Sequence, residues 1–279
     1  MKTKTKIFIA KIIFNILIFF GFKKKNLVKR NSIFWKLDIS EGIDLSIFLF
    51  GSFQNKLVRS ISDYILNYKK RDIFFYIIDI GSNIGDKSLS LAKNLISKDF
   101  KQFQIYSIEA SDYAFDKQKK NININPKLKN KIKSFKLFVS DKKKKPKNVY
   151  SSWQLDKNKN THKVHKGTLK KINEYTKTVS LDDFIKKNKI KRKLILKLDV
   201  DGYEMSVLKS SIKTLKKIKP IIFMEYAPYL FKENNLNIKD FLNFVKKNNY
   251  SLYDLDFKKL DRVNINEGSS TDIVLISDR

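Results

Sequence analysis

The sequence contains no cysteine and very little histidine, and these absences exclude several kinds of chemistry. Without cysteine, the 279-residue chain can form no disulfide, no thiolate metal site and no cysteine nucleophile, and it fits a reducing compartment. Its two histidines, His162 and His165, leave little scope for an imidazole-bound zinc or iron ion, although His165 is a candidate general base. We therefore predict an activity that needs no metal.

Arginine is also scarce, although the chain is strongly basic. Lysine and arginine together number 59 against 28 acidic residues, a net charge of +31, yet only six of the 59 are arginine. Arginine has the planar fork that suits phosphates and base edges, so its scarcity makes a nucleic-acid partner unlikely. The lysines are spread along the chain beside many isoleucines and asparagines, and a bias toward A/T-rich codons explains this most simply. The charge would still attract anionic surfaces such as acidic lipids and glycans.

The N-terminus combines an apolar stretch with basic flanks. The stretch from Ile7 to Phe22 is shorter than the ~20 residues that a membrane-spanning helix needs, and it lacks a clear signal-peptide cleavage site. Lys4, Lys11 and Asn15 would share one side of a helix. Two interpretations remain open: a helix in a membrane interface, anchored by lysines 23–25, or a helix packed on the protein's own core. The expected location is the cytoplasm, and the first interpretation adds peripheral contact with the inner face of the cytoplasmic membrane.

We divide the chain into an N-terminal extension, residues 1–70, and an α/β domain, residues 71–279. In the extension, alternating apolar residues over 34–54 predict a β-hairpin. Within the α/β domain, residues 142–177 form a polar insertion without a core period. Its lysine-rich beginning is typical of a solvated loop.

Strand-like and helix-like segments alternate from residue 73 onward. Strands are predicted over 73–80, 104–109, 134–140, 194–200, 220–226, 251–257 and 272–277, with helices between most of them. This alternation predicts a doubly wound, mostly parallel, seven-stranded Rossmann-like sheet. In such folds the ligand lies at the carboxyl ends of the strands, where this sequence places Asp79, Glu109 and Asp199, with Asp141 directly after another strand.

The turn after the first of these strands, DIGSNIGDKS, has glycines at 81 and 85. The spacing is one residue too short for a P-loop, and Ser82-Asn83 stands where a dinucleotide fold needs a glycine near the pyrophosphate. A third ligand, S-adenosylmethionine, has no phosphate and carries an ammonium and a sulfonium, so it should prefer carboxylates. We predict that it is held by Asp79, Gly81, Ser82, Asn83, Gly85, Glu109 and Asp141.

Three segments together resemble the FkbM-type methyltransferases: DIGSNIGDKSLSLA, IYSIEAS, and TVSLDDFI followed by LILKLDVDGYEMSVLKSS and KPIIFMEY. Their order and spacing match from about Ile73 to Tyr226, and KLDVDGYE is the more family-specific part. The resemblance implies a class I methyltransferase fold that uses S-adenosylmethionine. It also implies O-methylation of hydroxyls, often on sugars or glycan-linked acceptors.

A base near the acceptor hydroxyl would assist methyl transfer, because a sugar hydroxyl is a poor nucleophile. The candidates are Asp199 at a strand end, Glu204 in the first turn of the next helix, and Glu225 at the end of the following strand. We expect Asp199 to face the methyl group.

The leading hypothesis is an S-adenosylmethionine-dependent O-methyltransferase that acts on a sugar hydroxyl of a glycan or a lipid-linked saccharide. The alternatives are an RNA or DNA methyltransferase, suggested only by the charge, and a non-catalytic protein that binds a membrane or a partner.

Overall fold

The computed structural model describes residues 3–68, 73–141, 145–156, 167–191, 193–234, 236–261, 263 and 269–278. Both histidines, and with them the candidate base His165, lie outside the described residues.

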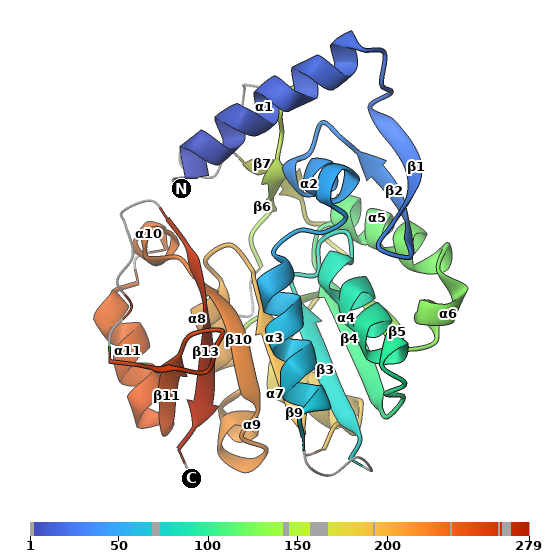
Figure 1. The fold of residues 1–279 in the computed structure, drawn as a ribbon. Coiled ribbons are helices and arrows are strands. Elements are labelled where there is room, and N and C mark those ends of the chain that lie inside the picture. Colours follow the sequence, from blue (N-terminus) through green and yellow to red (C-terminus); the bar gives the residue numbers. More distant parts are fainter. Residues whose placement is uncertain are drawn as a thin grey trace.

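A twisted, mixed β-sheet forms the centre of the molecule (Figure 1). In the described residues it has nine strands in the order β12-β11-β13-β10-β9-β3-β4-β5-β8, and the inner strands from β10 to β5 are parallel. The seven predicted strands form its middle, and two short strands, β8 and β12, extend its edges. The strands are β3 (Phe75–Ile80), β4 (Phe103–Glu109), β5 (Ile132–Val139), β8 (Lys177–Val179), β9 (Leu194–Leu198), β10 (Ile221–Tyr226), β11 (Tyr250–Tyr253), β12 (Lys259–Leu260) and β13 (Thr271–Ser277).

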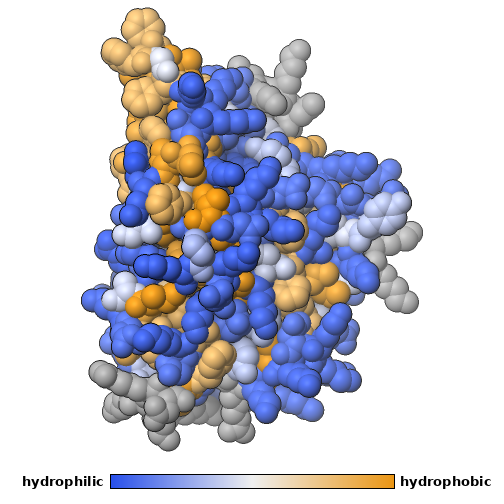
Figure 2. All heavy atoms as spheres, turned by 90° about the vertical axis from the view of Figure 1, so that its right-hand side faces the viewer, coloured by the Kyte–Doolittle hydropathy of each residue, from blue (hydrophilic) through white to orange (hydrophobic). Residues whose placement is uncertain are grey.

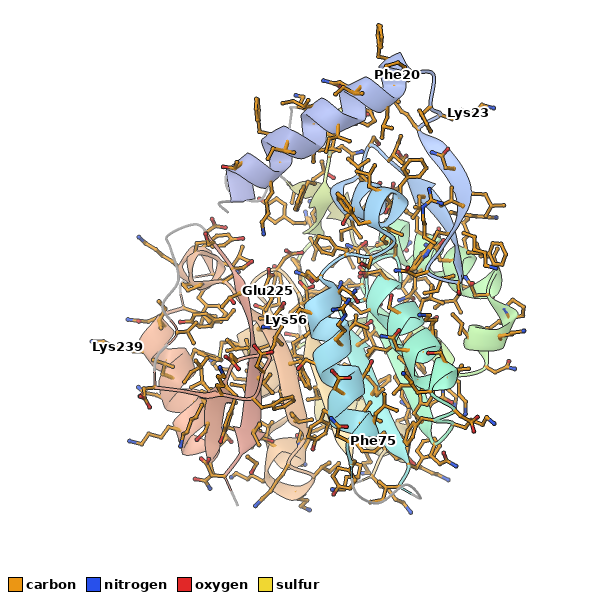
Figure 3. All side chains as sticks on the ribbon, viewed as in Figure 1. Phe20, Lys23, Lys56, Phe75, Glu225 and Lys239 are labelled. Atoms are coloured by element: carbon orange, nitrogen blue, oxygen red, sulfur yellow. The ribbon has the colours of Figure 1, made fainter. Side chains whose placement is uncertain are left out.

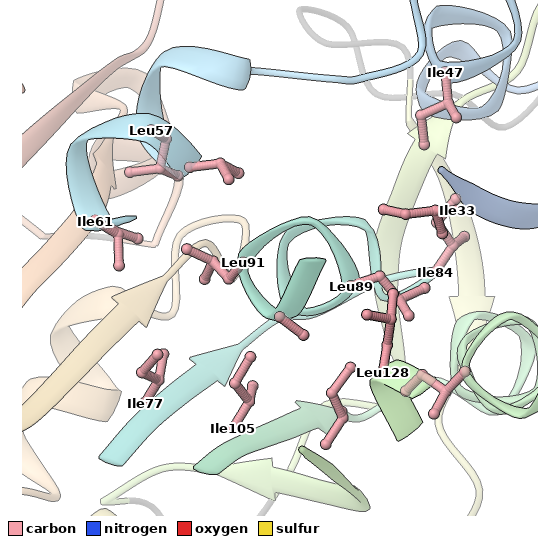
Figure 4. Packing of buried hydrophobic residues seen from close by; sticks show 14 of the residues in the cluster. Ile33, Ile47, Leu57, Ile61, Ile77, Ile84, Leu89, Leu91, Ile105 and Leu128 are labelled. Carbon is pink, nitrogen blue, oxygen red and sulfur yellow. The ribbon is translucent and has the colours of Figure 1, made fainter. Parts of the chain in front are cut away.

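Helices cover both faces of the sheet, which confirms the doubly wound fold. They are α3 (Asn55–Leu66), α4 (Asp86–Ser97), α5 (Asp112–Asn123), α6 (Pro126–Lys129), α7 (Leu181–Lys187), α8 (Glu204–Lys209), α9 (Ile212–Lys217), α10 (Pro228–Glu233) and α11 (Ile238–Lys247). Adjacent residues of a strand point to opposite faces of the sheet. Ile77 belongs to the core cluster under α3 and α4 (Figure 4), whereas Ile78 belongs to the cluster on the other face, which includes residues of α7, α8 and α11. Burial on both faces explains why these strands are continuously apolar.

The chain order reverses its direction along the sheet at β3. Strand β4 lies on one side of β3 and β9 on the other, and both pair with it in parallel. Ligands of open α/β sheets bind outside the carboxyl ends of the strands at such a switch point. We therefore expect the ligand site at the carboxyl ends of β3 and β9.

The N-terminal extension lies over the carboxyl end of the sheet (Figure 1). The part over the sheet consists of α1 (Thr3–Phe19), an antiparallel hairpin of β1 (Lys25–Arg30) and β2 (Ile33–Asp38), and α2 (Gly42–Phe50). Helix α3, which also falls within residues 1–70, packs instead on a face of the sheet. The predicted hairpin over 34–54 is therefore wrong: its first half is the second strand of an earlier hairpin, and its second half is a helix. Residues 43–50 are apolar at almost every position, so they suit either period. Helical turns place Asp44 and Phe48 together on the buried side.

The polar insertion also contains strands that were not predicted. Strand β6 (Asn148–Trp153) pairs antiparallel with β7 (Gly167–Lys171) beside the extension. An isolated bridge joins Glu41 to Gln154, directly after β6, and the backbone amide of Leu155 donates to Ser40. The pairing partners of these residues lie far away in sequence, so local periodicity does not reveal them.

Candidate active site

A cleft of about 250 Å³ lies between the carboxyl ends of the inner strands and the N-terminal extension. Its floor comes from the ends of β3, β4, β9 and β10, and its walls come from the extension, from β6 and from α10. Figure 3 shows Glu225 at the end of β10 that faces α1. The charged, polar and aromatic groups of the lining include Asn83, Glu109, Asp199, Asp201 and Glu225, together with Lys6, Phe53, Asp86, Lys87, Tyr150, Trp153, Lys197, Tyr203 and Tyr229.

The turn after β3 is held by backbone geometry that requires glycine. Gly81 has a φ of +76°, and a Cβ atom there would lie 1.8 Å from the carbonyl oxygen of Asp199. The ends of β3 and β9 thus approach each other more closely than any side chain would permit. Gly81 therefore brings the glycine turn and Asp199 to the same end of the cleft.

Glu109 is fixed by three donors at the end of β4. Its Oε2 accepts a hydrogen bond from the amide of Asn83 at 3.0 Å, and its Oε1 accepts from the amide and the hydroxyl of Ser111, both at 2.9 Å. Burial raises the pKa of Glu109 above its ordinary value, while these hydrogen bonds oppose the rise. Each carboxylate oxygen has two lone pairs, so one remains free for a ligand donor.

Asp79 is enclosed beneath the cleft and does not line it. Its Oδ1 forms an ion pair with Nζ of Lys197 at 3.0 Å, and its Oδ2 accepts from the hydroxyl of Ser88 at 2.7 Å. Lys197 also donates to the carbonyl of Gly81 at 2.9 Å and lies 3.6 Å from Oδ2 of Asp199. Burial alone would lower the pKa of Lys197, but the charges of Asp79 and Asp199 outweigh it and the pKa is raised. Lys197 therefore binds three acceptors at the switch point as a permanent cation.

The turn after β9, DVDGYE, presents two carboxylates to the cleft. Asp199 and Asp201 line it, and Asp201 has a left-handed φ of +47°. Burial, followed by the charge of Asp199, raises the pKa of Asp201 well above its usual value. Glu204 does not line the cleft: its Oε1 accepts from the amides of Val200 at 3.1 Å and Gly202 at 3.3 Å, and so it closes the turn.

Glu225 faces these carboxylates from β10. Burial, followed by the charge of Asp199, raises its pKa well above the ordinary value. Burial likewise raises the pKa of Asp272, on the neighbouring strand β13, to about 6. Like charges share this end of the cleft, so the carboxyls do not all ionise together.

The outer wall contains a buried ion pair from the first turn of α4. Nζ of Lys87 lies 2.6 Å from Oδ2 of Asp86, donates to the carbonyl of Phe53 at 3.0 Å and sits 4.8 Å above that ring. Trp153 closes the wall, and it packs so tightly on Gly42 that a Cβ there would lie 2.6 Å from its ring.

Five of the predicted site residues meet at the cleft: Gly81, Asn83, Glu109, Asp199 and Glu225. The other five do not line it. Asp79, Ser82 and Glu204 are buried behind its surface, Gly85 packs on Gln118, and Asp141 is exposed, with its amide bonded to the carbonyl of Ser206.

Sequence reasoning missed Lys197, Asp201, Tyr150 and Tyr229 as lining residues of the cleft. Lys197 had a detectable signal, because it is the one charged residue inside the apolar strand Leu194–Leu198. A lysine at such a position is buried and must have an acidic partner. Tyr150 and Tyr229 had no such signal, since only the tertiary fold brings their segments to the cleft.

Among the described residues, no group of three or more His, Cys, Asp or Glu side chains is arranged to hold a metal ion. Within the same part of the chain, no helix has both the length and the apolar character needed to cross a membrane.

The switch point at β3, the glycine turn that follows it and the carboxylates at the ends of β4, β9 and β10 define a Rossmann-like, class I methyltransferase fold. The chain belongs to the FkbM family of methyltransferases, because the family profile described as the methyltransferase FkbM domain matches residues 79–252.

Several solved methyltransferases are similar to this chain at low sequence identity. The N-terminal domain of human METTL16 is 11% identical, with a TM-score of 0.48 over 96% of this chain and 80% of that one. Methyltransferase FkbM from Methylobacillus flagellatus KT is 14% identical, with a TM-score of 0.43 over 75% of this chain and 46% of that one. Precorrin-6y C5,15-methyltransferase from Geobacter metallireducens GS-15 is 9% identical, with a TM-score of 0.42 over 78% of this chain and 88% of that one. No curated protein matches the sequence.

Proposed function

We propose that the protein is an S-adenosylmethionine-dependent O-methyltransferase whose acceptor is a sugar hydroxyl of a glycan or a lipid-linked saccharide. The observation that carries this proposal is the acidic cleft at the switch point, where Glu109 and Asp199 flank the Gly81 turn. Family membership supports methyl transfer; the cofactor and the acceptor class are inferred from the chemistry of the lining.

The lining suits S-adenosylmethionine better than a phosphate-bearing cofactor. Its ammonium, sulfonium and ribose hydroxyls are cations and donors, and the cleft offers Glu109, Asp199 and the Asn83 side chain as acceptors. When bound, this cofactor supplies a methyl group activated by the sulfonium. Asp79 would act indirectly, because its carboxylate holds Lys197 and through it the Gly81 carbonyl.

Asp199 is the best placed group to accept a proton from the acceptor hydroxyl. It lines the cleft and is about one-third exposed. Its Oδ2 lies 3.6 Å from the ammonium of Lys197. Glu225, whose raised pKa favours the protonated form, can donate a hydrogen bond that orients the acceptor. In this arrangement Asp199 serves as the base and Glu225 as the hydrogen-bond donor.

The aromatic wall supports a sugar as acceptor. This wall is formed by Tyr150, Trp153 and Tyr229, which line the cleft together with the carboxylates. Aromatic faces pack against the C–H faces of sugar rings, while carboxylates accept from their hydroxyls. An arginine-poor cleft lining fits a phosphate-rich acceptor such as RNA less well.

Calorimetry with S-adenosylmethionine tests the cofactor assignment. We expect Glu109→Gln to weaken binding by roughly 10- to 100-fold, which is the loss of one hydrogen bond to a charged group. Asp199→Asn should retain most of the affinity and lose transfer, and the exposed Asp63→Asn on α3 should change neither. Equal affinity in the wild-type and Glu109→Gln proteins, with both folded by circular dichroism, would refute the site.

Mass spectrometry of surface glycans and glycolipids from cells with and without the gene tests the acceptor. The expected difference is one methyl group on a sugar, present only with the wild-type gene and absent with Asp199→Asn. Transfer of a labelled methyl group to RNA, with no change in glycans, would support the nucleic-acid alternative instead.

A further inference from the structure

Helix α1 presents an apolar face to solvent. Phe8, Ile12, Ile16 and Phe19 follow one another at spacings of four, four and three, so they form one stripe along the helix. Their side chains are 66%, 44%, 50% and 86% exposed. Single exposed apolar residues are ordinary, but a stripe that includes two open phenylalanine rings marks an interaction surface.

The opposite face of α1 is already used by the protein's own core. Phe14 is buried there, and Ala10, Leu17 and Ile18 pack against the same cluster. One side of the helix therefore packs on the protein's own core, as one interpretation of the N-terminal stretch expected. The other side is uncovered, as a helix in a membrane interface would require. The core contacts fix the direction in which the exposed stripe points.

Basic residues adjoin the apolar stripe. Phe20 and Phe22 continue it beyond the helix, 72% and 46% exposed, and exposed lysines follow at positions 23–25. Figure 3 shows Phe20 and Lys23 together at the far end of α1. Figure 2 shows hydrophobic atoms gathered at the upper edge of a surface that is otherwise mostly hydrophilic.

We propose that this α1 face, defined by Phe8, Ile12, Ile16, Phe19 and Phe20, docks on an anionic lipid bilayer with the helix parallel to the membrane. The rings would enter the headgroup region, and Lys23 and Lys25 would contact anionic headgroups. A second copy of the chain is a poorer occupant, because with a net charge of +31 it brings further positive charge to the lysines, whereas anionic headgroups neutralise them.

The proposed docking would place the cleft beside the bilayer. Lys6 lines the cleft, and Phe8, two residues further, points outward, because two residues span about 200° around a helix. A lipid-linked acceptor could then reach the cleft without leaving the membrane. This consequence rests on the proposed function, whereas the docking itself does not.

Tryptophan fluorescence with vesicles tests the docking on the full chain. The Phe19→Trp protein is mixed with vesicles of phosphatidylcholine alone or mixed with phosphatidylglycerol, with brominated chains as quenchers. Phe74→Trp is the matched control, since Phe74 is 42% exposed next to the amino end of β3. We expect a blue shift and quenching for Phe19→Trp with the anionic vesicles, and no change beyond the wild-type signal for Phe74→Trp.

Co-sedimentation measures the contributions of the rings and of the lysines. We expect Phe8→Ser/Phe19→Ser to lower vesicle affinity at least about tenfold, and Lys23→Gln/Lys25→Gln to lower it by about tenfold or more at low salt. Phe74→Ser should bind like the wild type. Because the substituted residues are exposed, these proteins should remain folded, which circular dichroism checks.

Two results would overturn the proposal. In the first, salt abolishes vesicle binding equally in all variants, and brominated lipids do not quench the tryptophan of Phe19→Trp. Such binding would be non-specific attraction by the net charge. In the second, light scattering shows that the wild type is a dimer and that Phe8→Ser/Phe19→Ser is a monomer, and the wild type does not bind vesicles. This result would assign the α1 face to a second copy of the chain. Neither result depends on methyl transfer.

Discussion

Replacing Lys197 by methionine tests whether this buried lysine holds the switch point together. Methionine has a similar length and no charge, so the change removes the ammonium and leaves the strand apolar. Asp79, fully buried, would keep only the hydrogen bond from Ser88 and would lose its counter-ion. Breaking a buried pair on one side costs about 3–5 kcal/mol of unfolding free energy, a large part of the roughly 5–15 kcal/mol of a typical domain.

A second substitution makes this magnitude diagnostic. Asp79→Asn removes the unpaired charge and can still accept the Ser88 hydroxyl. The double variant should therefore be more stable than Lys197→Met alone, and the two single changes should not add. Urea unfolding of the wild type, both single variants and the double variant gives the interaction free energy directly. A cost below about 1 kcal/mol, or strictly additive single changes, would refute the assignment of Lys197 as the cation that neutralises Asp79.

Two further substitutions test other parts of the structure. Gly81→Ala should cost about 2–5 kcal/mol, because it adds a collision with the Asp199 carbonyl to the strain of a left-handed φ; Gly21→Ala, at a φ of +83° with nothing nearby, should cost only about 1–2 kcal/mol in urea unfolding. Equal losses would show that the close approach is absent. Burial is the largest cause that raises the pKa of Asp44 to about 7, so the stabilising contribution of its neutral form is present below about pH 4 and lost as pH rises through 7. In thermal unfolding, Asp44→Asn should therefore flatten the fall in stability between pH 5 and pH 8, and an unchanged slope would contradict the assigned burial.

The sequence alone determined the order of the seven main strands of the α/β domain and of most helices between them. The apolar runs of β3, β4, β9 and β10 are long, and turn signals bound them, so their identity depends little on distant partners. Carboxylates at strand ends were predictable for a related reason: parallel strands end at one edge of the sheet. Glu109, Asp199 and Glu225 thus reached the cleft as expected.

Only the tertiary structure decided how the predicted residues are used. Asp79 and Asp199 both lie near strand ends, yet Asp79 is enclosed with Lys197 and Asp199 opens to the cleft. The reason is that Asp79 lies inside β3, paired with Lys197 of β9, whereas Asp199 follows the last residue of β9. Residues 43–50 suit either a strand or a helix by their pattern, and only the tertiary fold, in which Asp44 meets Lys117 at 2.7 Å from 73 residues away, shows that they form helix α2.

The N-terminal helix combines both kinds of information. Its composition established an apolar helix with basic flanks, whereas the packing of Phe14 on the core selected the face that remains exposed. Periodicity is a property of neighbours along the chain, and so a sequence can specify it. Burial, ion pairing and exposure depend on which distant segments meet, and these are settled only when the whole chain has folded.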